Sequence, residues 1–308
     1  TRGSVITALK FTNSFLYRAT LGTFFDCLKG KRPWKKLFVN FKAVMTLPLV
    51  YAGLAKDFWM QFDHYMKIEE DVPSTYFFIP FKYRSGSDPQ HRTSKKRAAK
   101  YDITDIKAEV ARLQNHGDEI CLHGIDAWHD HELARDELRR ISQIANKSEI
   151  GVRMHWLCFN HDSFNILDKA GFSYDSTYGY NDTIGFKGGT TQAFQPIGTN
   201  NIFEIPLHIQ DSALYLAGRN NLSDSKAWEE CKKVIKTTKA YGGVLTILWH
   251  QRSIAPERLY KDEYIRLLKY LKNDHIVWFA TGSKVAQWFK KRRDFRFENI
   301  KWNAKSVR

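Results

Sequence analysis

The sequence predicts an α/β fold in which a parallel sheet of about seven strands closes, or nearly closes, into a barrel wrapped by helices. Two observations predict it. From residue 72 onward, short apolar runs alternate with helical segments across short loops, which is the pattern of βα repeats. The strand-like runs VLTIL and YFFI are apolar throughout, as in strands that helices cover on both faces. Periodicity alone does not decide between a closed barrel and an open sheet.

The first 70 residues precede this repeat and read as helices with many basic residues. Phe, Leu and Ile recur at three- and four-residue spacings, with lysines and arginines between them. This pattern predicts either an ordinary helical layer with a solvated basic face or an amphipathic segment at a membrane surface. The chain is therefore divided into a basic helical segment over 1–70, the barrel over 71–293 and a basic tail over 294–308.

The elements of the barrel follow one another in regular order. Strands are predicted at STYFFIP, DEICLHG, GVRMHWLCF, FSYDST, IFEIPLHI, VLTILWH and HIVWFAT. Helices are predicted at YDITDIKAEVARLQNHG, ELARDELRRISQIANK, DSFNILDKAG, SDSKAWEECKKVIKTTKAYGG, APERLYKDEYIRLLKYLKN and SKVAQWFKKRR. Thr104 is the predicted N-cap of the first helix and Gly117 its stop, and Gly171 stops the third.

Composition limits the classes of partner. The 308 residues include 48 basic and 33 acidic side chains, a formal charge of +15. This charge favours anionic partners: an acidic glycan, a phosphorylated lipid carrier, a membrane face or nucleic acid. Basic runs such as HRTSKKRAAK are accompanied by no recognised nucleic-acid motif, so we expect no specific nucleic acid.

Cysteine usage and hydropathy indicate the compartment. The four cysteines show no C-x-x-C spacing, and two of them lie in apolar runs, which indicates a reducing compartment. The longest apolar run, AVMTLPLVYAGLA, is shorter than the roughly 18–20 residues that span a bilayer. We therefore expect a cytoplasmic protein, with peripheral membrane contact through the basic N-terminal helices as an open alternative.

Polar side chains gather where the predicted strands end, which is where parallel α/β folds place their chemistry. The residues at or beside strand ends are His123, Arg153, His155, Asp175, His208 and His250. A single histidine at such a position is ordinarily a satisfied structural residue. Several in one chain predict a shared polar site.

The loop HGIDAWHDH is rich in groups that bind zinc or another first-row divalent ion. His123 supplies one ligand, and a second would come from Asp126, His129 or His131. Asp126 can share a helical turn with His123, whereas His129 reaches it only within a loop. His131 is expected in the first turn of the next helix, facing solvent.

At these residues the chain resembles a known family. LHGIDAWHD, GVRMHWL, AGFSYDSTYGYND, FEIPLHIQDSAL and GGVLTILWHQRSIAPERL occur in the order and spacing of the polysaccharide deacetylase family, the carbohydrate esterases with a NodB-homology domain. The resemblance is closest to a bacterial branch with an HGIDAW loop, associated with capsule or lipopolysaccharide genes. It covers residues 72–293.

The resemblance implies a distorted (β/α) barrel and a divalent metal, most commonly zinc, whose bound water attacks an N- or O-acyl group on a sugar. His123 would be a metal ligand, with Asp126, and His129 behind it, replacing a second histidine that is Ala127 here. Arg153 would orient the catalytic base, and His250 would be the general acid for the leaving group. The substrate would be a carbohydrate or glycolipid of bacterial surface-polysaccharide metabolism. Its expected contacts are His155, Trp156, Asp175 and His208.

One feature of the family is missing from the sequence. No D-D or D-x-D pair precedes STYFFIP, and Asp26 and Asp63 stand alone in helix-like contexts. Either the pair lies upstream of Thr1 or the domain is inactive. The alternative function is therefore a non-catalytic glycan-binding domain on the same fold.

Overall fold

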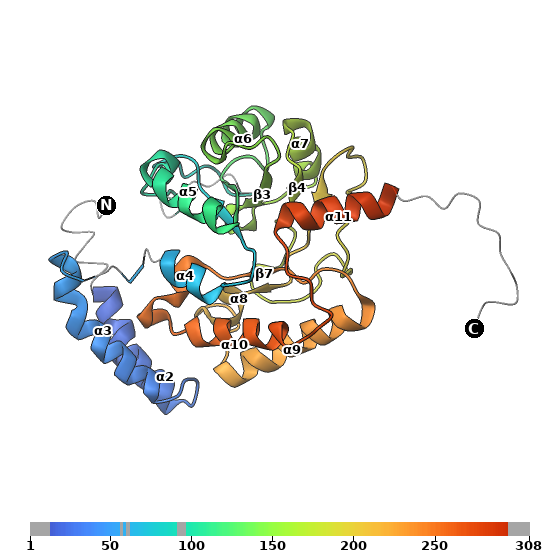
Figure 1. Ribbon diagram of the computed structural model, residues 1–308. Coiled ribbons are helices and arrows are strands. Elements are labelled where there is room, and N and C mark those ends of the chain that lie inside the picture. The colour runs from blue at the N-terminus through green and yellow to red at the C-terminus, as the bar shows by residue number, and fades with distance from the viewer. Residues whose placement is uncertain (1–12, 56–57, 60–61, 91–96, 295–308) are drawn as a thin grey trace, which may run out of the picture.

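The protein is described by a computed structural model, in which residues 13–55, 58–59, 62–90 and 97–294 are placed. Helices surround a central group of strands, and the N-terminal helices α2 and α3 lie side by side at the outer edge (Figure 1). The predicted tail over 294–308 lies outside the described residues, apart from Asp294 at the end of the last helix.

The described strands are all parallel and form two sheets. Five strands pair in chain order: β1 (Thr75–Phe78), β2 (Glu119–Gly124), β3 (Gly151–Met154), β4 (Tyr174–Asp175) and β5 (Phe203–Glu204). The second sheet pairs β6 (Ile209–Gln210) with β7 (Ile247–Leu248). The predicted α/β fold with a parallel sheet is confirmed. Because the run IFEIPLHI divides between β5 and β6, the barrel is interrupted there.

Helices occupy both the N-terminal segment and the outside of the barrel. The N-terminal ones are η1 (Arg18–Gly22), α2 (Thr23–Leu28), α3 (Lys35–Tyr51) and α4 (Phe62–Ile68). Those of the barrel are η2 (Ile103–Ile106), α5 (Lys107–His116), α6 (His131–Ala145), η3 (His155–Leu157), α7 (Ser163–Ala170), α8 (Asp211–Tyr215), α9 (Asp224–Tyr241), η4 (Gln251–Ile254), η5 (Pro256–Arg258), α10 (Lys261–Lys272) and α11 (Gly282–Asp294). Within the described residues, no helix is both long and apolar enough to cross a bilayer.

Alternation along β2 decides which side chains face the barrel interior. Ile120 and Leu122 pack into the large core cluster that includes Val110 and Leu113 of α5. Cys121, one residue out of phase, packs instead with Tyr174 and with side chains of α11. His123 shares the parity of Cys121, so β2 directs it to the same inner face.

Two local predictions are wrong. HIVWFAT is not a strand, because a turn at Asp274 occupies the backbone N–H groups of Ile276 and Val277. The side chains of Ile276 and Trp278 are 73% and 58% exposed, whereas Phe279 packs against the core cluster that includes Leu267 and Leu271, so the run is covered on one side only. The first barrel helix begins at Asp102, whose carboxylate accepts the N–H of Thr104, the residue predicted as the cap.

The predicted helix stops are confirmed. Gly117 and Gly171 follow α5 and α7 with φ values of 98° and 101°. A side chain is disfavoured in this left-handed region, so glycine ends each helix at the lowest conformational cost. Both stops precede a strand of the sheet, and they thereby fix where β2 and β4 begin.

Candidate functional site

The register of the sheet places His123 beside Arg153. The two residues are paired across β2 and β3, and His123 Nδ1 lies 2.8 Å from the Arg153 carbonyl oxygen. A carbonyl can only accept, so Nδ1 carries the proton and Nε2 carries the lone pair. Burial, reinforced by the neighbouring His155, holds the pKa of His123 well below its usual range. His123 is therefore a neutral base with a free Nε2.

His155 and His250 lie on the same side of the barrel as His123. The rings of His123 and His155 are 4.9 Å apart between centroids. Burial lowers the pKa of His155 to about 3, helped by Arg97, His250 and Arg252. His250 also contributes to the low pKa of His123. The three imidazoles thus form one electrostatically coupled group, although they come from three separate segments.

A strained backbone presents Trp156 next to this group. Trp156 and Leu157 have φ values of 62° and 51°, a region that bulky residues rarely adopt. The Asn181 side chain donates to the Trp156 carbonyl at 2.9 Å and supports this conformation. As a result the indole is 44% exposed and its centroid lies 5.7 Å from that of His155.

His250 is held by a buried carboxylate, Asp211. Its Nδ1 lies 2.6 Å from Asp211 Oδ1, and the His250 backbone N–H donates to Oδ2 at 3.0 Å. Ser253 also donates to Oδ2. Burial alone would raise the pKa of Asp211, but the imidazole and these hydrogen bonds outweigh it, and the pKa lies below its usual value. Asp211 is thus ionised, Nδ1–H of His250 donates to it, and Nε2 belongs to a ring that is 31% exposed.

Asp211 is not among the site residues that the sequence predicts. It directly follows β6 and opens α8, whose five residues are all buried. The signal that could have found it is its place at the end of the run EIPLHIQ, the same criterion that selected His250. The pairing itself joins residues 39 positions apart and is not readable from either stretch.

Arg153 lies deeper than the histidines and organises two buried carboxyl groups. Its Nε and Nη2 donate to the carbonyl and hydroxyl oxygens of Ser176 at 2.9 and 2.8 Å, and its guanidinium lies 4.4 Å from the Phe77 ring centroid. Burial raises the pKa of Asp175 and of Glu204, and each is fully buried. Because the ionised Asp175 raises the pKa of Glu204 further, Glu204 holds a proton between them at neutral pH. Asp175 therefore lies beneath the site rather than at its surface.

His208 also lies below the surface. It is 1% exposed, and its Nδ1 accepts the backbone N–H of Thr246 at 3.2 Å. Its ring packs against Phe186 at 5.0 Å, and burial lowers its pKa to about 4. The geometry gives His208 a neutral, packed position behind the strand ends.

Asp126 and His129 belong to a separate polar cluster in the loop after β2. Asp126 Oδ1 accepts the Ser87 N–H at 2.9 Å and lies 3.3 Å from His129 Nε2, and Arg84 lies 3.4 Å from Oδ2. The loop itself is held by Glu137, whose carboxylate accepts the N–H groups of Ile125 and Asp126, each at 2.9 Å. Asp126 is thus committed to an arginine and a backbone donor.

The described residues do not fit a divalent metal site. Within residues 13–55, 58–59, 62–90 and 97–294, no three His, Cys, Asp or Glu side chains gather closely enough to hold an ion. His123 Nε2 is a suitable donor atom, but Asp126 contacts Arg84 and His129 instead. Asp63 of α4 pairs with Arg112 of α5, and Asp26 lies in α2.

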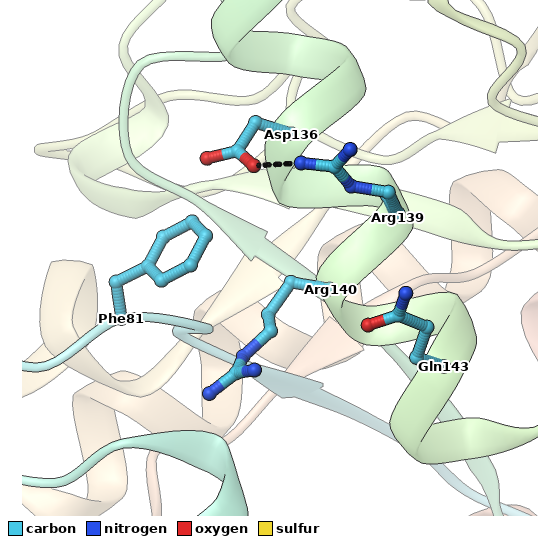
Figure 2. A pocket seen from close by; sticks show the side chains of 5 residues that line it. All are labelled: Phe81, Asp136, Arg139, Arg140 and Gln143. Atoms are coloured by element: carbon cyan, nitrogen blue, oxygen red, sulfur yellow. Dashed lines mark hydrogen bonds and ion pairs between the residues drawn. The ribbon is translucent and has the colours of Figure 1, made fainter.

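Two cavities in the described part of the chain are lined by residues other than the site histidines. One of about 300 Å³ is lined by Phe81 and by side chains of α6 (Figure 2). Its arginines are already paired, Arg139 with Asp136 and Arg140 with Asp102. None of its lining residues is a predicted site residue. The candidate site at His250 is therefore identified by its pairing with Asp211 and not by the size of a cavity.

No known family profile matches the sequence, and no curated protein matches it. Solved structures do match. One from Mycobacterium smegmatis, assigned as a polysaccharide deacetylase, has a TM-score of 0.55 and 19% identity over 77% of this chain and 79% of that one. The chain therefore has the distorted barrel fold of that protein, as the sequence resemblance implied.

Two further matches superpose less well. A structure from Pseudomonas aeruginosa PAO1 with the same assignment has a TM-score of 0.48 and 16% identity, over 63% of this chain and 66% of that one. One from Bordetella bronchiseptica, assigned to O-antigen biosynthesis, has a TM-score of 0.34 and 15% identity, over 78% and 87%.

Proposed function

We propose that the chain hydrolyses an acyl group from a carbohydrate or glycolipid, with His250 as the residue that transfers protons. The observation that carries this proposal is the Asp211–His250 pair. A buried, ionised carboxylate fixes the imidazole through Nδ1 and leaves Nε2 on the partly exposed side of the ring. This arrangement suits a general acid–base residue, because the carboxylate orients the ring and stabilises its charged form.

The proton balance of such a reaction needs one group of this kind. The Nε2 lone pair takes a proton from water as the water oxygen attacks the acyl carbonyl, and His250 becomes an imidazolium beside Asp211. Collapse of the tetrahedral intermediate breaks the bond from the carbonyl carbon to the sugar oxygen or nitrogen, and Nε2–H returns the proton to that atom. The products are the free acid and the deacylated sugar, and His250 ends neutral.

Neighbouring residues would bind the substrate. Trp156 offers an exposed aromatic face beside His155, and flat aromatic faces stack on apolar faces of sugar rings. The exposed Arg252 lies near His155, and the half-buried Arg219 lies near Asp211. These two guanidinium groups support a substrate that carries an anionic group.

Members of the resembled family use a divalent metal to activate water. The described residues do not complete a metal site, so no step above is assigned to a metal, and zinc remains a prediction for direct measurement by metal analysis and calorimetry. Arg153 keeps a positioning role in the proposal, since its donors contact Ser176.

A second candidate, a glycan-binding domain without turnover, is favoured by Trp156. Backbone strain at Trp156 and Leu157 is retained only where the surrounding structure enforces it, and such strain concentrates at functional sites. An exposed indole held in this way serves binding as well as catalysis.

The experiment is hydrolysis of N-acetylated chito-oligosaccharides and of acetylated xylan by the full chain, its His250→Ala variant and its Asp211→Asn variant. We expect turnover to fall by roughly a hundred- to ten-thousand-fold in His250→Ala with the fold retained. His161→Ala, at an exposed histidine on the surface, is the matched control and should keep full turnover. Full activity in His250→Ala removes His250 from the mechanism. Saturable binding without turnover, lost in Trp156→Ala, identifies the second candidate instead.

A further inference from the structure

The N-terminal helices expose an unusual amount of apolar surface. Of the 22 exposed large hydrophobic side chains in the described part of the chain, 13 lie between Tyr17 and Leu54. Phe38 is 76% exposed, Met45 64% and Phe41 61%. Folded proteins that stay in water rarely expose contiguous apolar patches larger than a few hundred Å², and larger ones mark interaction sites.

These side chains form two continuous rows. Four on α2 and on η1 with its N-cap recur at helical spacing, and five on α3 and its N-cap do the same. The rows consist of Tyr17, Leu21, Phe24 and Leu28, and of Trp34, Phe38, Phe41, Met45 and Leu49. Phe24 and Trp34 touch edge to face, with centroids 5.9 Å apart, and join the two rows. We call these nine residues the outer apolar face.

The opposite side of α3 is buried, and its first two positions are polar. The buried stripe consists of Lys36, Asn40, Ala43, Leu47 and Val50 and lies about half a turn from the outer apolar face. Lys36 Nζ lies 2.6 Å from Asp262 and donates to the Leu259 carbonyl at 3.0 Å. At its first turn the helix is thus attached to the barrel through Lys36, while its aromatic residues point outward.

The preceding loop is attached in the same way. Arg32 pairs with Asp224 at 2.7 Å, with only 2% of its side chain exposed, and its guanidinium lies over the rings of Tyr215 and Tyr260. The hairpin of α2 and α3 is therefore anchored by buried charges. Its orientation is fixed, and only one side of it is available to a partner.

The charge around the outer apolar face has one sign. Between residues 13 and 55 the sequence has seven lysines and arginines and a single acidic residue, Asp26. The exposed basic residues are Arg18, Lys29, Lys35 and Lys42. Aromatic and aliphatic side chains bordered by basic ones are the composition of helices that lie in the interface of an anionic bilayer.

We propose that the outer apolar face binds the surface of a membrane that contains anionic lipid, with α2 and α3 lying along the interface. The apolar rows would enter the headgroup region while the lysines contact lipid phosphates. Lys36 contacts the segment that follows His250, and α3 packs against η5. Docking would therefore hold the loop next to the candidate site near the bilayer.

A second copy of the chain is the other occupant to weigh, and charge disfavours it. Two copies paired through this face would bring the same basic residues against one another without acidic partners. An anionic bilayer satisfies the hydrophobic side chains and the charges together, so it is the occupant we propose.

The test is cosedimentation of the full chain with vesicles of phosphatidylcholine and phosphatidylglycerol, compared with vesicles of phosphatidylcholine alone. We expect binding to the anionic vesicles that weakens with salt. The triple variant Phe38→Ser, Phe41→Ser, Met45→Ser should bind roughly thirtyfold more weakly, because three apolar side chains no longer enter the interface. Its matched control replaces Tyr241, Ile276 and Trp278 by serine, at 78%, 73% and 58% exposed, and should bind like the wild type.

A charge-reversal pair tests the electrostatic part. Replacing Lys29, Lys35 and Lys42 by glutamate should weaken binding to anionic vesicles about a hundredfold. The same change at Lys226, Lys236 and Lys269, which are exposed on α9 and α10, should retain most of the binding to anionic vesicles. Lipid should also shift the tryptophan emission to shorter wavelength, and Trp34→Phe should remove that shift.

Any one of three results would overturn the proposal. The first is a wild type that does not bind anionic vesicles, and the second is binding by both triple serine variants that equals that of the wild type. The third is an equal loss of binding in the two charge-reversal variants. A wild type that is dimeric without lipid, and monomeric with the Phe38, Phe41 and Met45 substitutions, makes the second copy the occupant instead. None of these readouts depends on hydrolysis.

Discussion

The barrel and the N-terminal hairpin of α2 and α3 differ in which residues they bury and which they expose. In the barrel, Ile120 and Leu122 are buried and the histidines stand where strands end. In the hairpin, Lys36 and Asn40 are buried while Phe38 and Phe41 face outward. The barrel gains its stability from apolar burial, whereas the hairpin's attachment depends on charged pairs. The difference indicates that water surrounds the barrel and that a second apolar environment covers the hairpin.

The largest expected effect comes from the buried charges of the barrel. Arg153→Met removes two hydrogen bonds to Ser176 and leaves Asp175 and Glu204 without their cation. We expect a loss of about 3–5 kcal/mol in the free energy of unfolding, measured with urea. The folded-state pKa of the carboxyl pair, already raised, should rise further. The deficit should therefore grow as pH rises above about 6, the folded-state pKa of Asp175, because wild type and variant then differ in how many protons their folded states bind. A deficit that is independent of pH would show that Arg153 does not stabilise these carboxylates.

The next largest effect tests the hairpin's polar attachment. Arg32→Met leaves Asp224 without its partner and removes the contact with Tyr215. We expect a loss of about 2–3 kcal/mol, smaller than at Arg153 because the Asp224 side chain keeps 15% of its exposure. Limited proteolysis should cut residues 28–35 faster in this variant. Lys35→Met, at an exposed neighbour, is the control; equal proteolysis in the two variants would mean that Arg32 does not anchor the hairpin.

A third effect concerns the neutral histidines of the site. Burial lowers the folded-state pKa of His155 to about 3, below the unfolded value of about 6.5. Stability from such a group is present above pH 6.5 and is lost as pH falls, because the unfolded chain binds the extra proton. His155→Asn should therefore gain about 1.4 kcal/mol per pH unit relative to wild type between about pH 6 and 4. Parallel stability curves for the two proteins in this range would contradict the assignment.

The smallest effect sharpens the comparison most directly. Phe38→Ser should change the free energy of unfolding by less than about 0.5 kcal/mol, because the ring is 76% exposed and packs against little. Leu47→Ala, on the buried side of the same helix at 5% exposure, should lose about 2–3 kcal/mol. Equal losses would mean that the outer apolar face is covered by the protein itself.

Much of the fold was readable because its determinants are local. The apolar runs of β1, β2 and β3 and the glycines after α5 and α7 act within a few residues of where they stand. The strand predicted at HIVWFAT does not form, because a run of β-branched and aromatic residues becomes a strand only if a neighbouring edge is available to pair with it. The segment instead follows a turn at Asp274, and its Ile276 and Trp278 side chains face outward.

The sequence by itself determined the α/β class, the order of the elements and the gathering of polar residues at strand ends, because hydrophobic period and helix stops are properties of short stretches. Only the tertiary structure decided that Asp211 holds His250, that Asp175 lies beneath the site with Glu204, and that Asp126 is committed to Arg84. It also decided which side of α3 is covered, since the helix carries apolar residues on both sides. Each of these depends on which segments meet in space, and the local sequence around a residue does not predict which distant residue it will contact.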